Sequence, residues 1–525
     1  MPLAGTAGIK RFTALRAIPL LVVSTALVTV MSTPGGAHAA TTAPPAIPST
    51  QDPSAGPDFT GRPAEAQPLA PQPRFDPQVS TMHGDAGNTK VTSAPGPLGA
   101  NPRVTSARAT AGTLLWDRQG GLSAGYVDTS SGTASYGISA LDPATMAVEF
   151  SWAAPSGAHL NIPYMSMNEH GRILVSSQEG HVYVVRRDGG SFSVERDIDL
   201  TAQGALRPGE PLLNSSWDAQ GDIWFTTGAV TGTDPGTGTT IGVLDQDGTA
   251  RVRHLDEQIV ENGIAVSGTT AYVVTGPAGA ADHADATGSL YALSAENEGA
   301  PEILWEEPYA AGDAVKPGGF ARGSGATPTL LGDRYVAITD NADDQIDLRV
   351  YRQGAVPQLV CSVPLFSAGA SANDIGAIGY EHDGQASVVV LDDYNAPVLP
   401  TASSDVDGPH NDMTAMAPGV QRIDVDADGT CRTVWTTPER IKSVPVLSAA
   451  TGLVYGYGQD ADLAADGTYV WYAEAIDFRT GEVVWKKRTG AGGTFNDIFA
   501  PASLGPDGTF YQRVAGGLVA VKDGG

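Results

Sequence analysis

The sequence predicts an all-β fold, a single β-propeller of eight four-stranded blades, with seven blades as the alternative. A strand–turn–strand pattern recurs eight times, at intervals of about 45 to 70 residues, and a β-pattern with such a period indicates a propeller or an array. The 64 Gly and 37 Pro residues favour many tight turns over long helices. The 525 residues could also form two or three average domains, so the repeat decides and the length does not.

The first element, residues 1–39, is typical of a secretory signal peptide. Lys10, Arg11 and Arg16 precede an apolar run, and an Ala-His-Ala tripeptide offers a cleavage site after Ala39. We expect an exported protein, extracellular or associated with the cell wall; the alternative is a signal anchor that stays in the membrane. No later apolar run is long enough to span a bilayer once the signal is removed.

The second element, residues 40–80, is rich in Pro, Ala and Thr. Such a composition cannot bury a core, so the sequence predicts a disordered linker there. The propeller is then expected to occupy residues 81–525.

The third element is the repeat, whose clearest copy is the stretch AIDFRTGEVVWKKRTG. In chain order the copies lie at residues 137–152, 181–198, 241–255, 289–307, 348–363, 420–435, 475–490 and 517–525. Each copy follows another strand pair, which gives four strands per unit with the first innermost. The last copy ends at its turn, and a segment near Leu114 is expected to supply the missing strand and close the ring, which removes free sheet edges.

The copy at 475–490 and the segment MHGDAGNTKVT, at 82–92, resemble the repeat and the entry segment of quinoprotein-like (PQQ-like) β-propellers. The resemblance implies a relation to alcohol dehydrogenases that hold the quinone with calcium and a ring of adjacent cysteines. This sequence has no adjacent cysteine pair, so PQQ is not the expected cofactor.

Two cysteines, Cys361 and Cys431, are the only ones in the chain. In an exported protein they predict one disulfide, which stabilises by about 4 kcal/mol on the chain-entropy model. The alternative is a pair of small buried thiols, because the two residues fall in the outer strands of neighbouring repeats.

The net charge and the short motifs of the sequence exclude more functions than they assign. The net charge of −27 and the pI near 4.5 argue against nucleic-acid binding, because such a chain repels phosphate backbones. The GLSAG stretch around Ser123 resembles a nucleophile elbow but lacks the helix that the elbow requires. The DVDADG stretch that begins at Asp424 is expected to be a hairpin turn, since Trp435 occupies the place of the bidentate Glu of a calcium loop.

Asn and Asp residues recur where innermost strands begin. If these positions converge on the axis of the ring, their oxygens could hold Ca²⁺. The metal-ligand candidates are Asn262, Asn373, Asp374, Asn496 and Asp497. Further candidates for a ligand-binding face are Asn161, Asn214, Glu261 and His410, the last in a long insertion at about 392–418. The alternative is that Asn and Asp form Asx-turns at loop ends.

The stretch NGIAVS, which begins at Asn262, resembles a strand of calcium-dependent lactonase and gluconolactonase-type propellers. That resemblance implies that Asn262 is a metal ligand. Three functions therefore stay open: a propeller that binds a ligand or a protein partner on the face with these residues, a calcium-dependent lactonase- or esterase-like hydrolase, and a PQQ-dependent oxidoreductase. Whether the protein is an enzyme, what it binds and its oligomeric state are not determined by the sequence.

Overall fold

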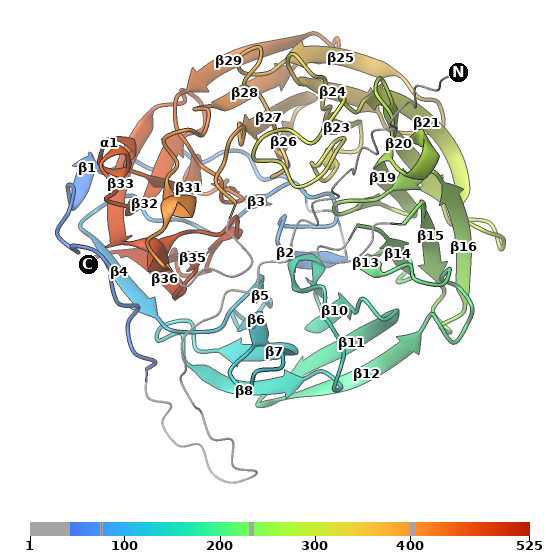
Figure 1. The fold of residues 1–525 in the computed structure, drawn as a ribbon, viewed down its shortest axis with the longest axis horizontal. Helices are drawn as coiled ribbons and strands as arrows, with labels where there is room; N and C mark the ends of the chain where they lie inside the picture. The colour runs from blue at the N-terminus through green and yellow to red at the C-terminus, as the bar shows by residue number, and fades with distance from the viewer. Residues whose placement is uncertain (1–42, 74, 76, 230–235, 399–404, 525) are drawn as a thin grey trace, which may run out of the picture.

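The computed structural model describes residues 43–73, 75, 77–229, 236–398 and 405–524. These form a ring of eight four-stranded antiparallel sheets, so the prediction of an all-β propeller with eight blades is confirmed (Figure 1). The predicted signal peptide lies outside the described residues. No helix in the described ranges is long and apolar enough to cross a membrane.

The blades follow one another around the ring in chain order, each from its innermost to its outermost strand. Blade 1 consists of β5 (Leu114–Trp116), β6 (Leu122–Asp128), β7 (Ser135–Leu141) and β8 (Val148–Ala153), and blade 2 of β9 (Ser166–Asn168), β10 (Arg172–Ser176), β11 (His181–Asp188) and β12 (Ser191–Asp199). Blade 3 consists of β13 (Leu212–Trp217), β14 (Ile223–Thr227), β15 (Gly238–Leu244) and β16 (Ala250–Asp256), and blade 4 of β18 (Ala265–Ser267), β19 (Thr270–Pro277), β20 (Thr287–Ser294) and β21 (Glu302–Ala310). A short strand, β17 (Gln258–Ile259), also pairs with β19.

Blades 5 to 7 repeat the arrangement. Blade 5 consists of β22 (Thr329–Leu331), β23 (Tyr335–Thr339), β24 (Asp347–Arg352) and β25 (Leu359–Pro364). Blade 6 consists of β26 (Ile378–His382), β27 (Gln385–Leu391), β28 (Val420–Val425) and β29 (Cys431–Thr437), and blade 7 of β30 (Val446–Ser448), β31 (Leu453–Gln459), β32 (Val470–Asp477) and β33 (Val483–Ala491). The single described α-helix, α1 (Ala461–Ala465), lies between β31 and β32. The predicted hairpin turn between β28 and β29 lies at Asp426 to Thr430, whereas Asp424 and Val425 still belong to β28.

Blade 8 combines the two ends of the described chain. Its inner strands are β34 (Ala502–Leu504), β35 (Phe510–Val514) and β36 (Gly517–Asp523), and its fourth is β4 (Pro102–Ala107), which pairs antiparallel with β36. The prediction that a segment near Leu114 supplies this strand is wrong, because Leu114 begins the innermost strand of blade 1. The difference follows from burial: Leu114 and Leu115 are buried, whereas β4 exposes alternate residues, as an outermost strand does.

The segment from residue 43 onwards packs against the ring, whereas the sequence predicts a disordered linker there. β1 (Phe59–Gly61) pairs antiparallel with β33 on the outer edge of blade 7 (Figure 1). Further along, the backbone N–H groups of Gln67 and Leu69 donate to the carbonyls of Thr451 and Ala449. The Pro, Ala and Thr side chains of this segment bury little apolar surface, but its backbone is held by hydrogen bonds to sheet edges, which need few apolar residues.

Residues 78–92 run through the centre of the ring, and we call this segment the plug. It begins with β2 (Gln78–Thr81), antiparallel to β9 of blade 2, and ends with β3 (Val91–Thr92), parallel to β30 of blade 7. Between them, the plug's carbonyls accept hydrogen bonds from the innermost strands of blades 4, 5 and 6. The plug therefore ties five blades together across the channel (Figure 1).

Apolar side chains fill the spaces between neighbouring blades. Val389 of blade 6, for example, shares a buried cluster with Leu447 and Ile476 of blade 7. Cys361 of β25 and Cys431 of β29 form the predicted disulfide, with their Cα atoms 6.2 Å apart. This bond joins the outermost strands of blades 5 and 6, so it pins two neighbouring blades at their outer edge.

Candidate ligand-binding site in the central channel

Asparagines that precede or lie within the innermost strands connect adjacent blades. The side-chain amide of Asn161 donates to the Leu212 carbonyl of blade 3 (2.7 Å), and that of Asn214 donates to the Asn262 carbonyl before blade 4 (2.9 Å). Asn262 in turn donates to the Gly325 carbonyl before blade 5. These three side chains therefore link each blade to the next by a hydrogen bond.

The oxygens of two metal-ligand candidates are already engaged. The Oδ1 atom of Asn262 accepts from the Gly263 N–H (2.8 Å), the Thr327 hydroxyl (2.6 Å) and the Tyr164 hydroxyl (3.2 Å). In Asn373, the side-chain amide donates to the Leu391 carbonyl, and Oδ1 accepts a long bond from Thr339. These amides are held by the protein itself.

Three carboxyl groups gather near Asn262. The Asp374 N–H donates to Asp393 Oδ2 (2.7 Å), and the carboxylate of Asp374 accepts the N–H of Phe320. Burial raises the pKa of Asp374 to about 6, and burial together with the Asp374 charge holds the pKa values of Asp393 and Glu261 well above their usual range. Burial thus favours the protonated forms of these acids.

The other pair of candidates, Asn496 and Asp497, surrounds a lysine. Lys442 is fully buried, and its ammonium donates to Asn496 Oδ1 (2.8 Å) and lies 3.4 Å from Asp497 Oδ1. Its ammonium also lies 4.8 Å from the centre of the Phe499 ring. A lysine ammonium therefore occupies the place that a metal cation would take between these two residues.

His410 lies at the edge of this second group. It belongs to a short 3-10 helix, Pro409–Asn411, is partly buried, and has a pKa lowered by burial and by the Lys442 charge. The predicted candidates thus divide between two groups, one at blades 2 to 6 and one at blades 6 to 8. Among the described residues, no group of three or more His, Cys, Asp or Glu side chains is arranged to hold a metal ion.

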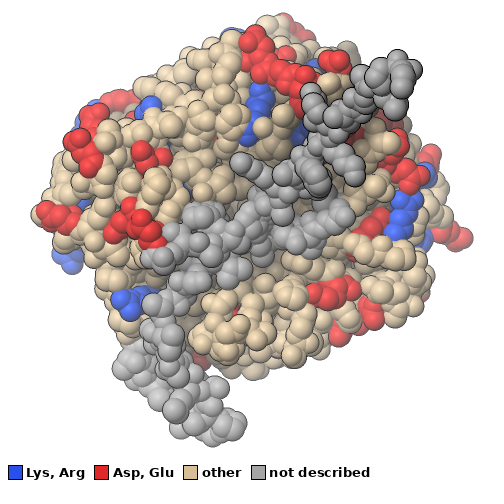
Figure 2. All heavy atoms as spheres, in the orientation of Figure 1, with Lys and Arg blue, Asp and Glu red and all other residues tan. Residues whose placement is uncertain are grey.

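Two loops meet over the channel on the side of these candidates. Phe320, between β21 and β22, packs edge to face against Phe499, between β33 and β34, with ring centres 4.8 Å apart. One loop belongs to blades 4 and 5 and the other to blades 7 and 8, so the contact crosses the axis. Acidic side chains outnumber basic ones around the circumference of the face in Figure 2.

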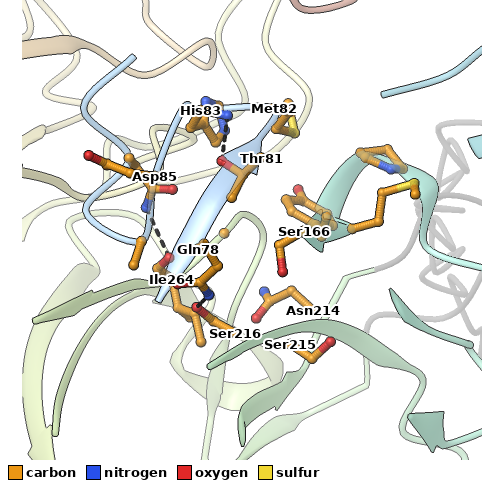
Figure 3. A pocket seen from close by; sticks show the side chains of 16 residues that line it. Gln78, Thr81, Met82, His83, Asp85, Ser166, Asn214, Ser215, Ser216 and Ile264 are labelled. Atoms are coloured by element: carbon orange, nitrogen blue, oxygen red, sulfur yellow. Dashed lines mark hydrogen bonds between the residues drawn. The ribbon is translucent and has the colours of Figure 1, made fainter. Parts of the chain in front are cut away.

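A polar cavity of about 40 Å³ lies between the plug and blades 2 to 4. Figure 3 shows Gln78 of the plug, Ser166 of blade 2 and Asn214 of blade 3 around it. In the described part of the chain, five buried atoms that border it have no hydrogen-bond partner: Gln78 Oε1, His83 Nδ1, Ser166 Oγ, Asn214 Oδ1 and Ser215 Oγ. Polar cavities of this size hold a few ordered waters, so we expect solvent to join plug and ring here.

A larger cavity, of about 400 Å³, lies between the plug and blades 7, 8 and 1. The plug and the residues directly after it contribute residues 79–82, 84 and 90–95, and the ring contributes residues 116–118, 445, 446, 502–504 and 506. From blades 1 and 8 it takes the innermost strands and the turns that follow them, whereas the predicted Asn and Asp candidates mostly precede innermost strands. The larger cavity therefore extends toward the opposite end of the channel from most of those candidates.

The charged groups that line the larger cavity have partners in the protein. Asp117 accepts the N–H groups of Gln119 (2.9 Å) and Gly121 (2.7 Å), and Arg118 forms an ion pair with Glu169 (2.7 Å). Lys90, whose pKa burial lowers to about 7, donates to the Ile375 carbonyl (2.6 Å).

Sequence reasoning missed this cavity because half of its wall comes from the plug and the chain that follows it. Ser80 falls at the end of the stretch predicted to be a linker, and the plug's path through the channel depends on pairing with strands far away in the sequence. The one signal in the sequence is the resemblance of residues 82–92 to the entry segment of other propellers, which carries no information about a cavity.

No family model matches the chain. An uncharacterized protein of Archaeoglobus fulgidus is 26% identical over 234 residues, which cover 41% of this chain and 44% of that protein. The chain thus spans less than half the length of this curated relative.

Similar solved structures include Sqt1 from Chaetomium thermophilum, with a TM-score of 0.44, 12% identity and coverage of 80% of this chain and 97% of that one. They also include the WD40 domain of SCAP from fission yeast, with a TM-score of 0.40, 11% identity and coverage of 80% and 98%. The β-propeller domain of Swd1 from Myceliophteria thermophila has a TM-score of 0.36, 13% identity and coverage of 68% and 96%.

Proposed function

We propose that this protein is an exported binding propeller that holds a small molecule in the larger cavity, between the plug and blades 7, 8 and 1. The observation that carries the proposal is the cavity of about 400 Å³, which falls in the size range of small-molecule sites. Export is supported by the signal-like residues 1–39 and by the disulfide, since disulfides persist in oxidising compartments.

The proposal moves the binding site away from the face that the sequence favours. On that face, the side-chain amides of Asn161, Asn214 and Asn262 donate hydrogen bonds to the next blade. The contact between Phe320 and Phe499 also spans the axis there. At the other end, exposed Ser93, Pro95 and Pro506 belong to the wall of the larger cavity and give it a mouth.

The calcium-dependent hydrolase is less well supported, because the donor set does not fit a shared calcium ion. Asn262 Oδ1 already accepts three hydrogen bonds, and Asp497 is paired with the Lys442 ammonium. The PQQ-dependent oxidoreductase lacks its ring of adjacent cysteines, since Cys361 and Cys431 bridge two blades instead. We derive no chemistry through either group.

The test is a thermal-shift screen of the full chain against a library of small metabolites, with the variant Ser93→Trp alongside. Ser93 is exposed at the mouth, so an indole there should fill the entrance without disturbing the core. A compound at 100 times its dissociation constant should stabilise the wild type by about 2.7 kcal/mol and Ser93→Trp far less.

The matched control is Ser191→Trp, an exposed serine at the start of β12, away from the channel. We expect this variant to respond to the compound as the wild type does. A library without any stabilising compound, or a compound that stabilises Ser93→Trp fully, would contradict the proposed site.

A further inference from the structure

We propose that the ligand of the larger cavity is a neutral, hydroxyl-rich compound of the saccharide or polyol class. This inference rests on the proposed function and names the chemistry of its ligand. Three properties of the wall carry it: free hydroxyl donors, paired charges and an aromatic ring beside apolar side chains.

Four hydroxyl groups in the wall share one hydrogen-bonding state. Each oxygen accepts an N–H of the protein: Ser80 from the Trp116 backbone (3.0 Å), Thr81 from His83 (2.9 Å), Thr92 from Ala94 (3.1 Å) and Ser503 from the Trp116 indole (2.9 Å). A hydroxyl that accepts still has its own hydrogen to donate. None of the four donates to an acceptor within the described residues, so the wall offers several O–H donors to a ligand.

These donors are also oriented by the protein. Because each oxygen is fixed by an N–H group, the remaining hydrogen has a limited range of directions, which lowers the entropic cost of binding. Two of the N–H groups belong to Trp116, so this residue fixes the Ser80 and Ser503 hydroxyls together. A ligand that presents several acceptor oxygens can use more than one of these donors.

The charges of the wall exclude an ionic ligand as the preferred one. Asp117 Oδ1 accepts two backbone N–H groups and Asp117 Oδ2 lies 3.9 Å from Arg187, Arg118 pairs with Glu169, and the Lys90 ammonium donates to the Ile375 carbonyl. An anion would have to displace Glu169 from Arg118, and a cation would have to compete for Asp117. A neutral compound needs no such exchange.

The rest of the wall suits a ligand with an apolar face. Trp116 lies in the wall, with its ring held between the Ser503 bond and the Tyr511 ring, 5.5 Å away. Met82, Val446 and Leu504 add apolar contacts. Sugar rings combine C–H faces with ring hydroxyls, so they match a wall of this mixed character, and a cavity of about 400 Å³ is large enough for a mono- or disaccharide.

The experiment titrates the full chain with a fixed panel and follows tryptophan fluorescence and calorimetric heat. The hydroxyl-rich probes are glucose, N-acetylglucosamine, trehalose and maltose; the others are indole, octanoate, inorganic phosphate and spermidine. We expect at least one saccharide to bind and to quench or shift the fluorescence, an effect that Trp116→Phe should reduce. The charged and the purely apolar probes should not bind in the cavity.

The donors are then removed one at a time. Thr92→Val replaces a wall hydroxyl by a methyl group of the same size and should raise the dissociation constant of the bound saccharide about tenfold. Thr133→Val, in an exposed turn outside the cavity, is the matched control and should leave the dissociation constant unchanged. The melting temperature of each variant without ligand separates a loss of donors from a loss of folding.

The outcomes distinguish the ligand class from the site. If indole or octanoate binds, and Ser93→Trp blocks it while no saccharide binds, the cavity is the site but the ligand class is wrong. If a saccharide binds equally to Ser93→Trp, the proposed site itself is wrong. An unchanged dissociation constant in Thr92→Val and in Ser80→Ala would overturn the role of the hydroxyls.

Discussion

At the scale of single residues, the polar groups of the channel form hydrogen bonds and ion pairs within the protein itself. Asn262 joins two blades, and Lys442 is enclosed by Asn496 and Asp497. A buried charge must be paired and hydrogen-bonded to be tolerated, and these residues meet that requirement. Asn and Asp at strand starts are therefore as consistent with structural bonds as with a metal site, and only their partners distinguish the two.

Asp374 gives a pH prediction at this scale. Its pKa is about 6 in the folded protein, above the value in an unfolded chain, so the folded state binds the proton more tightly. The stabilisation is complete below about pH 4 and is lost as the pH rises through about 6, on the order of 3 kcal/mol in all. Asp374→Asn should flatten this decline, as measured by melting temperatures between about pH 4 and pH 7.

The neighbouring acids set the control for this experiment. Asp393 and Glu261 also have raised pKa values, so part of the decline with pH should persist in Asp374→Asn. Asp128→Asn, at the exposed end of β6 in blade 1, should retain the full decline. Equal pH slopes in the wild type and Asp374→Asn would show that this carboxyl does not titrate as described.

At the scale of elements, the N-terminal strand β1 and the plug turn a ring of sheets into a closed unit. β1 adds an outermost strand to blade 7, and the plug pairs with innermost strands on both sides of the channel. Both rely on backbone hydrogen bonds between segments far apart in the sequence, from Gln78 opposite Asn168 to Phe59 opposite Lys487. Such pairing leaves almost no trace in local composition.

The attachment of β1 depends on one glycine. Gly61 has a φ of 87°, and a Cβ there would lie 2.1 Å from the Val484 carbonyl oxygen. Gly61→Ala should therefore detach β1 from β33 and expose the bond after Phe59, within β1, to chymotrypsin. The measurement is limited proteolysis followed by mass spectrometry.

Gly157→Ala is the matched control for this substitution. Gly157 has nearly the same φ, 88°, but open space where a Cβ would lie. It carries the backbone cost of about 1–2 kcal/mol without the clash. Equal rates of cleavage after Phe59 in the two variants would mean that a Cβ at position 61 does not detach β1 from β33.

At the scale of the whole molecule, the ring is held by interfaces between blades and by one covalent bond. The disulfide between Cys361 and Cys431 spans a sequence separation of 70 residues and joins blades 5 and 6. Elsewhere the blades are joined by packing and hydrogen bonds. The disulfide therefore restrains the unfolded chain more than any other single feature of the described structure.

The double variant Cys361→Ser/Cys431→Ser should lower the free energy of unfolding by about 4 kcal/mol on the chain-entropy model. Differential scanning calorimetry of the variant, and of the wild type with and without reductant, measures this. The reduced wild type should melt close to the double variant. A melting temperature that reduction leaves unchanged would contradict the expected contribution of the bond.

The sequence alone predicts the eight-bladed propeller, because the repeat is a local pattern of strands and turns that each copy carries for itself. It also predicts the disulfide, because a chain that the sequence predicts to be exported contains only two cysteines, which can pair only with each other. The candidate site is another matter: the sequence suggests Asn161, Asn214 and Asn262 for a ligand-binding face, whereas in the structure their amides connect blades.

Tertiary structure decided the rest. It packs the stretch predicted as a linker against blade 7, gives the fourth strand of blade 8 to Pro102–Ala107, and brings Ser80, Trp116 and Ser503 to one cavity. These outcomes depend on which distant strand edges and side chains meet, and the free energy of those contacts is a property of the closed ring. A repeat can therefore be recognised in the sequence, whereas the cavity that its copies enclose cannot.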